Sequence, residues 1–189
     1  MRPQIRIAST AEEASTLLNG EKLCQVAALL NGGIDCTIDQ VKYDGQEHGI
    51  LRLLFDNKQQ WAVRLPINPI GKFHYDDFEL PLTIMRTTTS LQQCLHKHGI
   101  KVPKVHWSCL RWSENPVGYP VVMTDWIDGQ ALDWEVISHR PEAKTRVLAQ
   151  LADYIFNLST LTESPEVLED LQRLQLNSTF LVCLINLDI

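Results

Sequence analysis

Three strand-like runs follow one another closely between residues 36 and 65, and this segment constrains the fold more than any other. Each run alternates apolar and polar residues or is rich in branched and aromatic ones, and each gap carries a turn signal. Turns this short join antiparallel strands. The segment therefore predicts a three-stranded antiparallel meander. Its runs are Cys36–Tyr43, Gly49–Phe55 and Gln60–Leu65, separated by Asp44-Gly45 and Asp56-Asn57-Lys58.

Helical patterns surround this meander. A capping box at Ser9 and Thr10 predicts two short helices, broken at Gly20 and stopped by Asn31-Gly32-Gly33. After a loop over 66–78, apolar spacing predicts a helix from about Leu82 to His98. Its start is expected late, because the threonines at 87–89 are poor helix formers. The remaining expected elements are strands over Val102–Leu110 and Tyr119–Trp126, and helices over 141–160 and 165–176. This order is an α+β pattern, with a five-stranded antiparallel sheet and one inserted helix.

Composition excludes several classes of protein. The 189 residues are 44% hydrophobic and 21% charged, which excludes a disordered or fibrous chain. With 17 Lys plus Arg against 23 Asp plus Glu, the net charge of −6 argues against nucleic-acid and anionic-membrane binding. Five cysteines without a C-x-x-C pair suggest free thiols. No signal peptide is recognisable, so we expect a cytoplasmic protein. We also expect no metal site, since His96 and His98 fall on different helix faces.

Four stretches give the chain a family resemblance. They resemble the third strand, the entry to the fourth strand, the hinge and the first large-lobe helix of the aminoglycoside-phosphotransferase-like family, which has a protein-kinase-like fold. They resemble in particular its large and mostly uncharacterised branch in filamentous fungi. The stretches are Phe55–Pro66, Gly99–Val105, Gly118–Gly129 and Leu151–Asp153.

The resemblance implies a domain organisation. Residues 1–33 would form an N-terminal helical segment, and residues 34–127 would form a kinase-like small lobe. Residues 128–189 would hold the linker and an incomplete helical large lobe with an atypical apolar tail. In this family ATP and Mg²⁺ lie between the lobes, and a phosphoryl group passes to a small-molecule hydroxyl.

The resemblance also implies nucleotide-binding residues in the small lobe. Gly45 and Gly49 would lie in a phosphate loop. The favoured alternative is an ordinary hairpin turn, because Asp44 and Glu47 would repel phosphate. Arg64 would be the third-strand cation, the alternative being an arginine on a solvent face. Arg64 shares a face with Trp61 only if a bulge intervenes. The acidic partner expected on the inserted helix falls near Thr87 or Thr88, neither of which is acidic.

The implied hinge contains Thr124, Asp125 and Trp126, whose backbone would meet the adenine. The alternative is an ordinary buried strand that ends in a linker. The catalytic part has no match, because no His-x-Asp followed five residues later by Asn occurs in the chain. No catalytic residue is therefore assigned.

We expect a truncated family member without phosphotransferase turnover. An exposed apolar C-terminal surface would favour self-association. Two alternatives are a non-catalytic nucleotide- or protein-binding module and a gene-model artefact.

Overall fold

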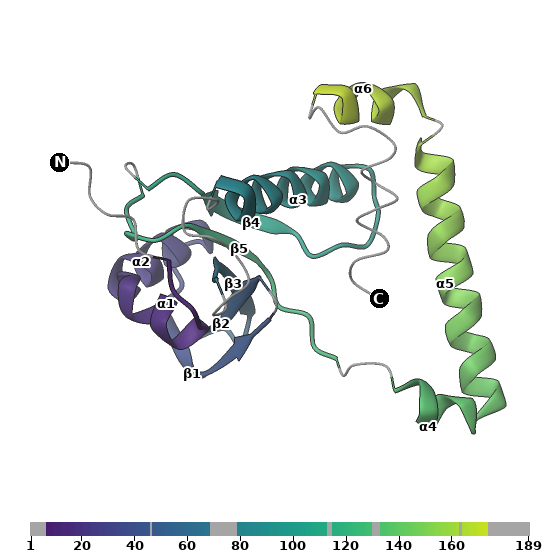
Figure 1. Ribbon diagram of the computed structural model, residues 1–189, viewed down its shortest axis with the longest axis horizontal. Helices are drawn as coiled ribbons and strands as arrows, with labels where there is room; N and C mark the ends of the chain where they lie inside the picture. Colours follow the sequence, from purple (N-terminus) through teal and green to yellow (C-terminus); the bar gives the residue numbers. More distant parts are fainter. Residues whose placement is uncertain are drawn as a thin grey trace. The chain divides into compact units, whose positions relative to one another are not determined.

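The computed structural model describes residues 7–45, 47–68, 79–112, 115–129, 133–162 and 164–173 (Figure 1). The chain divides into two compact units. The first comprises Met1–Gln92 and Pro103–Trp126, and the second comprises Gln93–Val102 and Ile127–Ile189. The predicted boundaries at 33/34 and 127/128 stay a prediction.

The first unit is built on a five-stranded antiparallel sheet in the order β1-β2-β3-β5-β4. The predicted meander is confirmed, and so is the α+β class. Such a sheet, followed by helices, is consistent with a kinase-like small lobe and a helical part. The strands are β1 Cys36–Asp44, β2 His48–Phe55, β3 Gln60–Pro66, β4 Val105–Cys109 and β5 Val121–Asp125.

Strict alternation along β2 and β3 gives the sheet two different faces. Leu51, Leu53, Val63 and Leu65 are fully buried in one hydrophobic core. Because neighbouring side chains on a strand point to opposite faces, the residues between them share the other, half-buried face. The buried face receives the N-terminal helices, which contribute Ala14, Leu18, Leu23 and Ala27 to the same core.

The two N-terminal helices are α1 Ala11–Leu17 and α2 Gly20–Leu30. The predicted capping box forms, since the Thr10 hydroxyl accepts from Glu13 N–H and the Ser9 N–H donates to the Glu13 carboxylate. The break predicted at Gly20 is wrong by one residue. Asn19 caps α2 by accepting from Lys22 N–H, and Gly20 is the first residue of that helix.

Helix α3 runs over Glu79–Lys97, so the late start predicted for it is wrong. It passes through the threonines because packing outweighs their low helix propensity: Met85 and Thr89 are buried. The Thr88 and Thr89 hydroxyls donate to the Met85 carbonyl, so both are satisfied within the helix. The strands predicted over 102–110 and 119–126 are confirmed as the shorter β4 and β5.

The described part of the second unit is helical, with α4 Trp134–Ser138, α5 Pro141–Thr162 and α6 Pro165–Arg173. Helix α4 was not predicted; Asp133 caps it by accepting from Glu135 and Val136 N–H. The tail beyond 173 and most of the predicted loop at 66–78 lie outside the described residues. Among the helices of the described ranges, none has the length and apolar character needed to cross a bilayer.

Candidate functional site

Arg64 lies on the half-buried face of the sheet. It pairs with Ile50 of β2 and Val122 of β5, in a register that runs without interruption along β3. Since no bulge intervenes, Arg64 and Trp61 point to opposite faces, and Trp61 belongs to the core. Ala62, two residues before Arg64, shares its face. The alternation thus places the predicted cation beside a small side chain in the middle of the sheet.

His48 is the titratable group next to Arg64. It is the first residue of β2. Ile50 pairs with Arg64, and His48, two residues before Ile50, points to the same half-buried face. Burial, reinforced by the Arg64 charge, lowers the pKa of His48 to about 4. At neutral pH His48 is therefore an uncharged imidazole beside a guanidinium.

The predicted phosphate-loop glycines lie at the β1–β2 turn. Gly45 N–H donates to the His48 carbonyl, 2.9 Å away, which closes the turn. A Cβ on Gly49 would lie 2.7 Å from both Cα and Cβ of Ala11, so the start of α1 requires glycine there. Asp44 accepts from Ala11 N–H at 2.6 Å and fixes the same contact. The packing of α1 thus accounts for Gly49 without any ligand.

The predicted hinge follows β5. Thr124 is buried and pairs with Ala62, so it belongs to the same face as Arg64. The carboxylate of Asp125 is held by His106 Nε2 at 2.7 Å and by Lys104 N–H at 2.9 Å. The N–H groups of Asp125 and Trp126 donate to carbonyls of Lys104 and Gln60. The Asp125 carbonyl accepts from the Thr124 hydroxyl at 3.2 Å, so these hinge groups are engaged within the protein.

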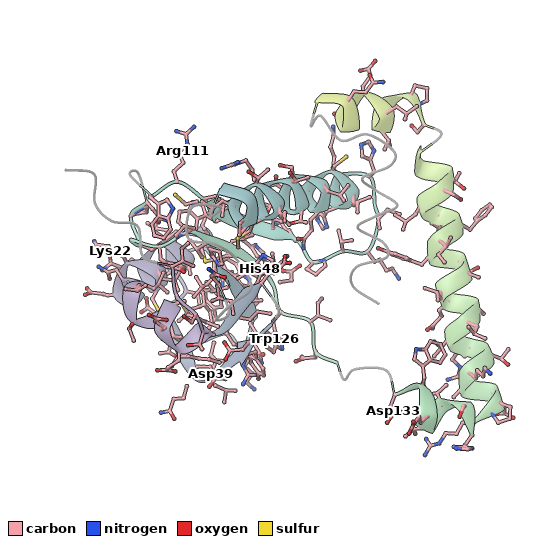
Figure 2. The ribbon with its side chains drawn as sticks, viewed as in Figure 1. Lys22, Asp39, His48, Arg111, Trp126 and Asp133 are labelled. Atoms are coloured by element: carbon pink, nitrogen blue, oxygen red, sulfur yellow. The ribbon has the colours of Figure 1, made fainter. Side chains whose placement is uncertain are left out.

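Trp126 lies against two side chains that the sequence analysis did not select. The guanidinium carbon of Arg52 lies 5.1 Å from the centre of the Trp126 indole. The ring centroids of Tyr43 and Trp126 are 5.6 Å apart. Arg52 is also ion-paired with Asp39. Figure 2 labels Trp126, Asp39 and His48, which all come from the sheet and its edge. We call Tyr43, Arg52 and Trp126 the aromatic–arginine cluster.

The sequence held little signal for this cluster. Arg52 and Tyr43 read as ordinary strand residues of β2 and β1, and only the folded structure brings them to Trp126. Helix α3 carries Thr87 and Thr88 at the place where the resemblance implies an acidic residue.

Comparison with known proteins gives one distant likeness. A crystal structure of a "putative aminoglycoside phosphotransferase" from Ralstonia eutropha JMP134 is similar at 13% identity and a TM-score of 0.42, over 61% of this chain and 30% of that one. The chain thus spans under a third of that protein. No protein-family model matches the chain, and no curated protein does.

The half-buried face can recognise a planar, anionic ligand. An indole and a guanidinium offer flat surfaces for stacking, and guanidinium groups pair with phosphate oxygens. Arg52 and Arg64 supply two guanidinium groups on this face, and that of Arg52 is paired with Asp39.

Proposed function

We propose that the half-buried face of the sheet binds ATP. The observation that carries this proposal is the common face of Arg52, Arg64 and Ala62, bordered by Trp126 at the end of β5. ATP is the nucleotide proposed because four stretches of the chain resemble the aminoglycoside-phosphotransferase-like family, which uses ATP.

Each group has a role in this proposal. The adenine stacks at the aromatic–arginine cluster, where Ala62 leaves room between Arg52 and Thr124, its partners on the neighbouring strands. Arg64 binds the phosphates, because a guanidinium forms short, charge-assisted hydrogen bonds with them. Neutral His48 adds a hydrogen-bonding group without repelling Arg64.

We further propose that these 189 residues do not transfer the phosphoryl group. Phosphoryl transfer needs a residue that orients the acceptor hydroxyl and ligands that hold Mg²⁺. The sequence has no His-x-Asp with an asparagine five residues later. Incubation with ATP, Mg²⁺ and a panel of hydroxylated small molecules should therefore give no phosphorylated product above the enzyme-free rate.

Calorimetric titration with ATP and with adenosine tests the binding proposal. Trp126→Leu should weaken both ligands by about 5- to 150-fold, the range expected for one stacked base. Arg64→Gln should weaken ATP but leave adenosine unchanged, because only ATP carries the phosphates. This split distinguishes a phosphate contact from general damage to the fold.

Two matched variants control for the substitutions themselves. Trp134→Leu removes an exposed tryptophan of α4, and Arg140→Gln removes an exposed arginine outside the sheet. Neither should change the affinity for ATP. Equal loss in Trp134→Leu and Trp126→Leu, or no ATP binding by the unmodified chain, would refute the proposed site.

A further inference from the structure

The end of α3 and helix α6 bring together three side chains of the kind that bind transition metals. Cys94 and His98 are four residues apart, and Asp170 comes from α6. One potential ligand atom from each lies within 4.8 Å of the others. All three residues belong to the second unit, separate from the sheet.

We propose that Cys94, His98 and Asp170 bind a zinc ion. Zinc takes sulfur, nitrogen and oxygen ligands at about 2.0–2.3 Å, usually in a tetrahedron. Ligand atoms at those bond lengths lie about 3.3–3.8 Å apart, so shifts of roughly 1 Å would complete the geometry. His98 Nε2 and Asp170 Oδ2 are already 3.1 Å apart.

Charge and burial favour a divalent ion at this cluster. Cys94 is 5% exposed, and the His98 and Asp170 side chains are 15% and 18% exposed. On binding, the Cys94 thiol loses its proton to solvent, His98 contributes a neutral nitrogen and Asp170 contributes its carboxylate. Two negative ligands then balance the two positive charges of zinc, so the occupied site is neutral and its burial costs less.

Lys97 competes with the ion for Asp170. Its ammonium lies 2.5 Å from Asp170 Oδ2, and its side chain is 65% exposed. An exposed ion pair is worth little, so zinc can replace Lys97 at small cost. A matched pair of opposite effects follows: loss of a ligand should weaken zinc binding, whereas Lys97→Gln should strengthen it several-fold.

The site has one coordination position left for water or another ligand. Three protein ligands leave the fourth corner of a tetrahedron open. His98 also lines an open cavity of about 540 Å³, together with Asn157, Thr160 and Ser164. Because Asp170 is 72 residues from His98, the ion also links two distant segments of the chain.

Titration of the metal-free full chain with Co²⁺ tests the proposal. One equivalent of cobalt should produce a thiolate-to-cobalt charge-transfer band, together with visible bands typical of four ligands. Zinc should then displace cobalt at one equivalent. Cys94→Ser should abolish the charge-transfer band, and His98→Gln and Asp170→Asn should each weaken binding at least 10- to 100-fold, the loss seen even for groups that only support a ligand.

His96→Gln is the matched control, because His96 is exposed, lies on the same helix and is absent from the cluster. Its cobalt affinity should be unchanged. Absence of the charge-transfer band from the unmodified chain, or its persistence in Cys94→Ser, would overturn the proposal. If Cys94→Ser fails to fold by circular dichroism, the half-buried His98 and Asp170 variants and the stoichiometry of the unmodified chain still decide the question.

Discussion

Gly49 shows how one residue couples a turn to a distant helix. The nearest atoms to a Cβ at this position are Cα and Cβ of Ala11, both 2.7 Å away and neither at the end of a flexible side chain. Only glycine permits this approach of β2 to the start of α1.

Gly49→Ala should destabilise the protein by about 1–3 kcal/mol, because α1 must shift to make room for the methyl group. Urea denaturation measures the change. Gly129→Ala is the control, since a Cβ there meets nothing within 4 Å and the backbone is not in the left-handed region. Equal stability of the Gly49 variant and the unmodified protein would show that α1 does not pack as closely as described.

His48 should make stability depend on pH. Its pKa of about 4 in the folded chain lies below the ordinary value of 6.5, so the unfolded chain binds more protons between these values. Stability should therefore fall as the pH drops from about 6.5 to 4, by up to about 1.4 kcal/mol per pH unit. Urea midpoints across this range measure the slope.

His48→Gln should flatten that dependence, because glutamine does not titrate. His139→Gln, at an exposed histidine between α4 and α5, should leave the slope as it is. An unchanged slope in the His48 variant would mean that another group is responsible.

At the scale of elements, α2 attaches to the sheet through one face. Leu23 is fully buried and belongs to the core with Leu51 and Leu53, whereas Leu29 on the same helix is 80% exposed. The contrast sets up two chemically identical substitutions with different expected costs.

Leu23→Ala should lower the free energy of unfolding by about 2–5 kcal/mol, the usual cost of a cavity in a packed core. Leu29→Ala should change it by less than about 0.5 kcal/mol. Denaturant midpoints compare the two directly. Similar losses of stability in the two variants would contradict the structure, in which Leu23 is buried and Leu29 is exposed.

At the scale of the whole molecule, α5 presents apolar side chains to solvent. Leu148, Leu151 and Ile155 follow helical spacing and are 36–50% exposed. Exposed apolar surface of this extent favours association. We propose that the chain self-associates through α5.

Sedimentation velocity should show a concentration-dependent oligomer that dissociates when Leu151 and Ile155 are both replaced by Gln. The same replacement at Ala149 and Asp153, on the opposite side of the helix, should leave association unchanged. A monomer at every concentration, or equal effects of the two double variants, would contradict this proposal.

The amino-acid sequence alone determined the class of the fold and most of its elements, because strand alternation, turn residues and helix caps act over a few neighbouring positions. The meander, the capping box at Thr10 and the long helix α5 are all of this kind. Local signals failed in two places. Asn19 rather than Gly20 separates α1 from α2, and α3 continues through its threonines because its buried face is packed.

Only the tertiary structure decided which side chains meet. The predicted residues Arg64 and Thr124 share a face because the register of β2, β3 and β5 is continuous, a fact that no single strand encodes. Arg52 on β2 and Tyr43 on β1 reach Trp126, which follows β5, only in the folded sheet. Asp170 reaches Cys94 and His98 across more than 70 residues. Contacts between segments so far apart depend on packing, and packing has no local signature in the chain.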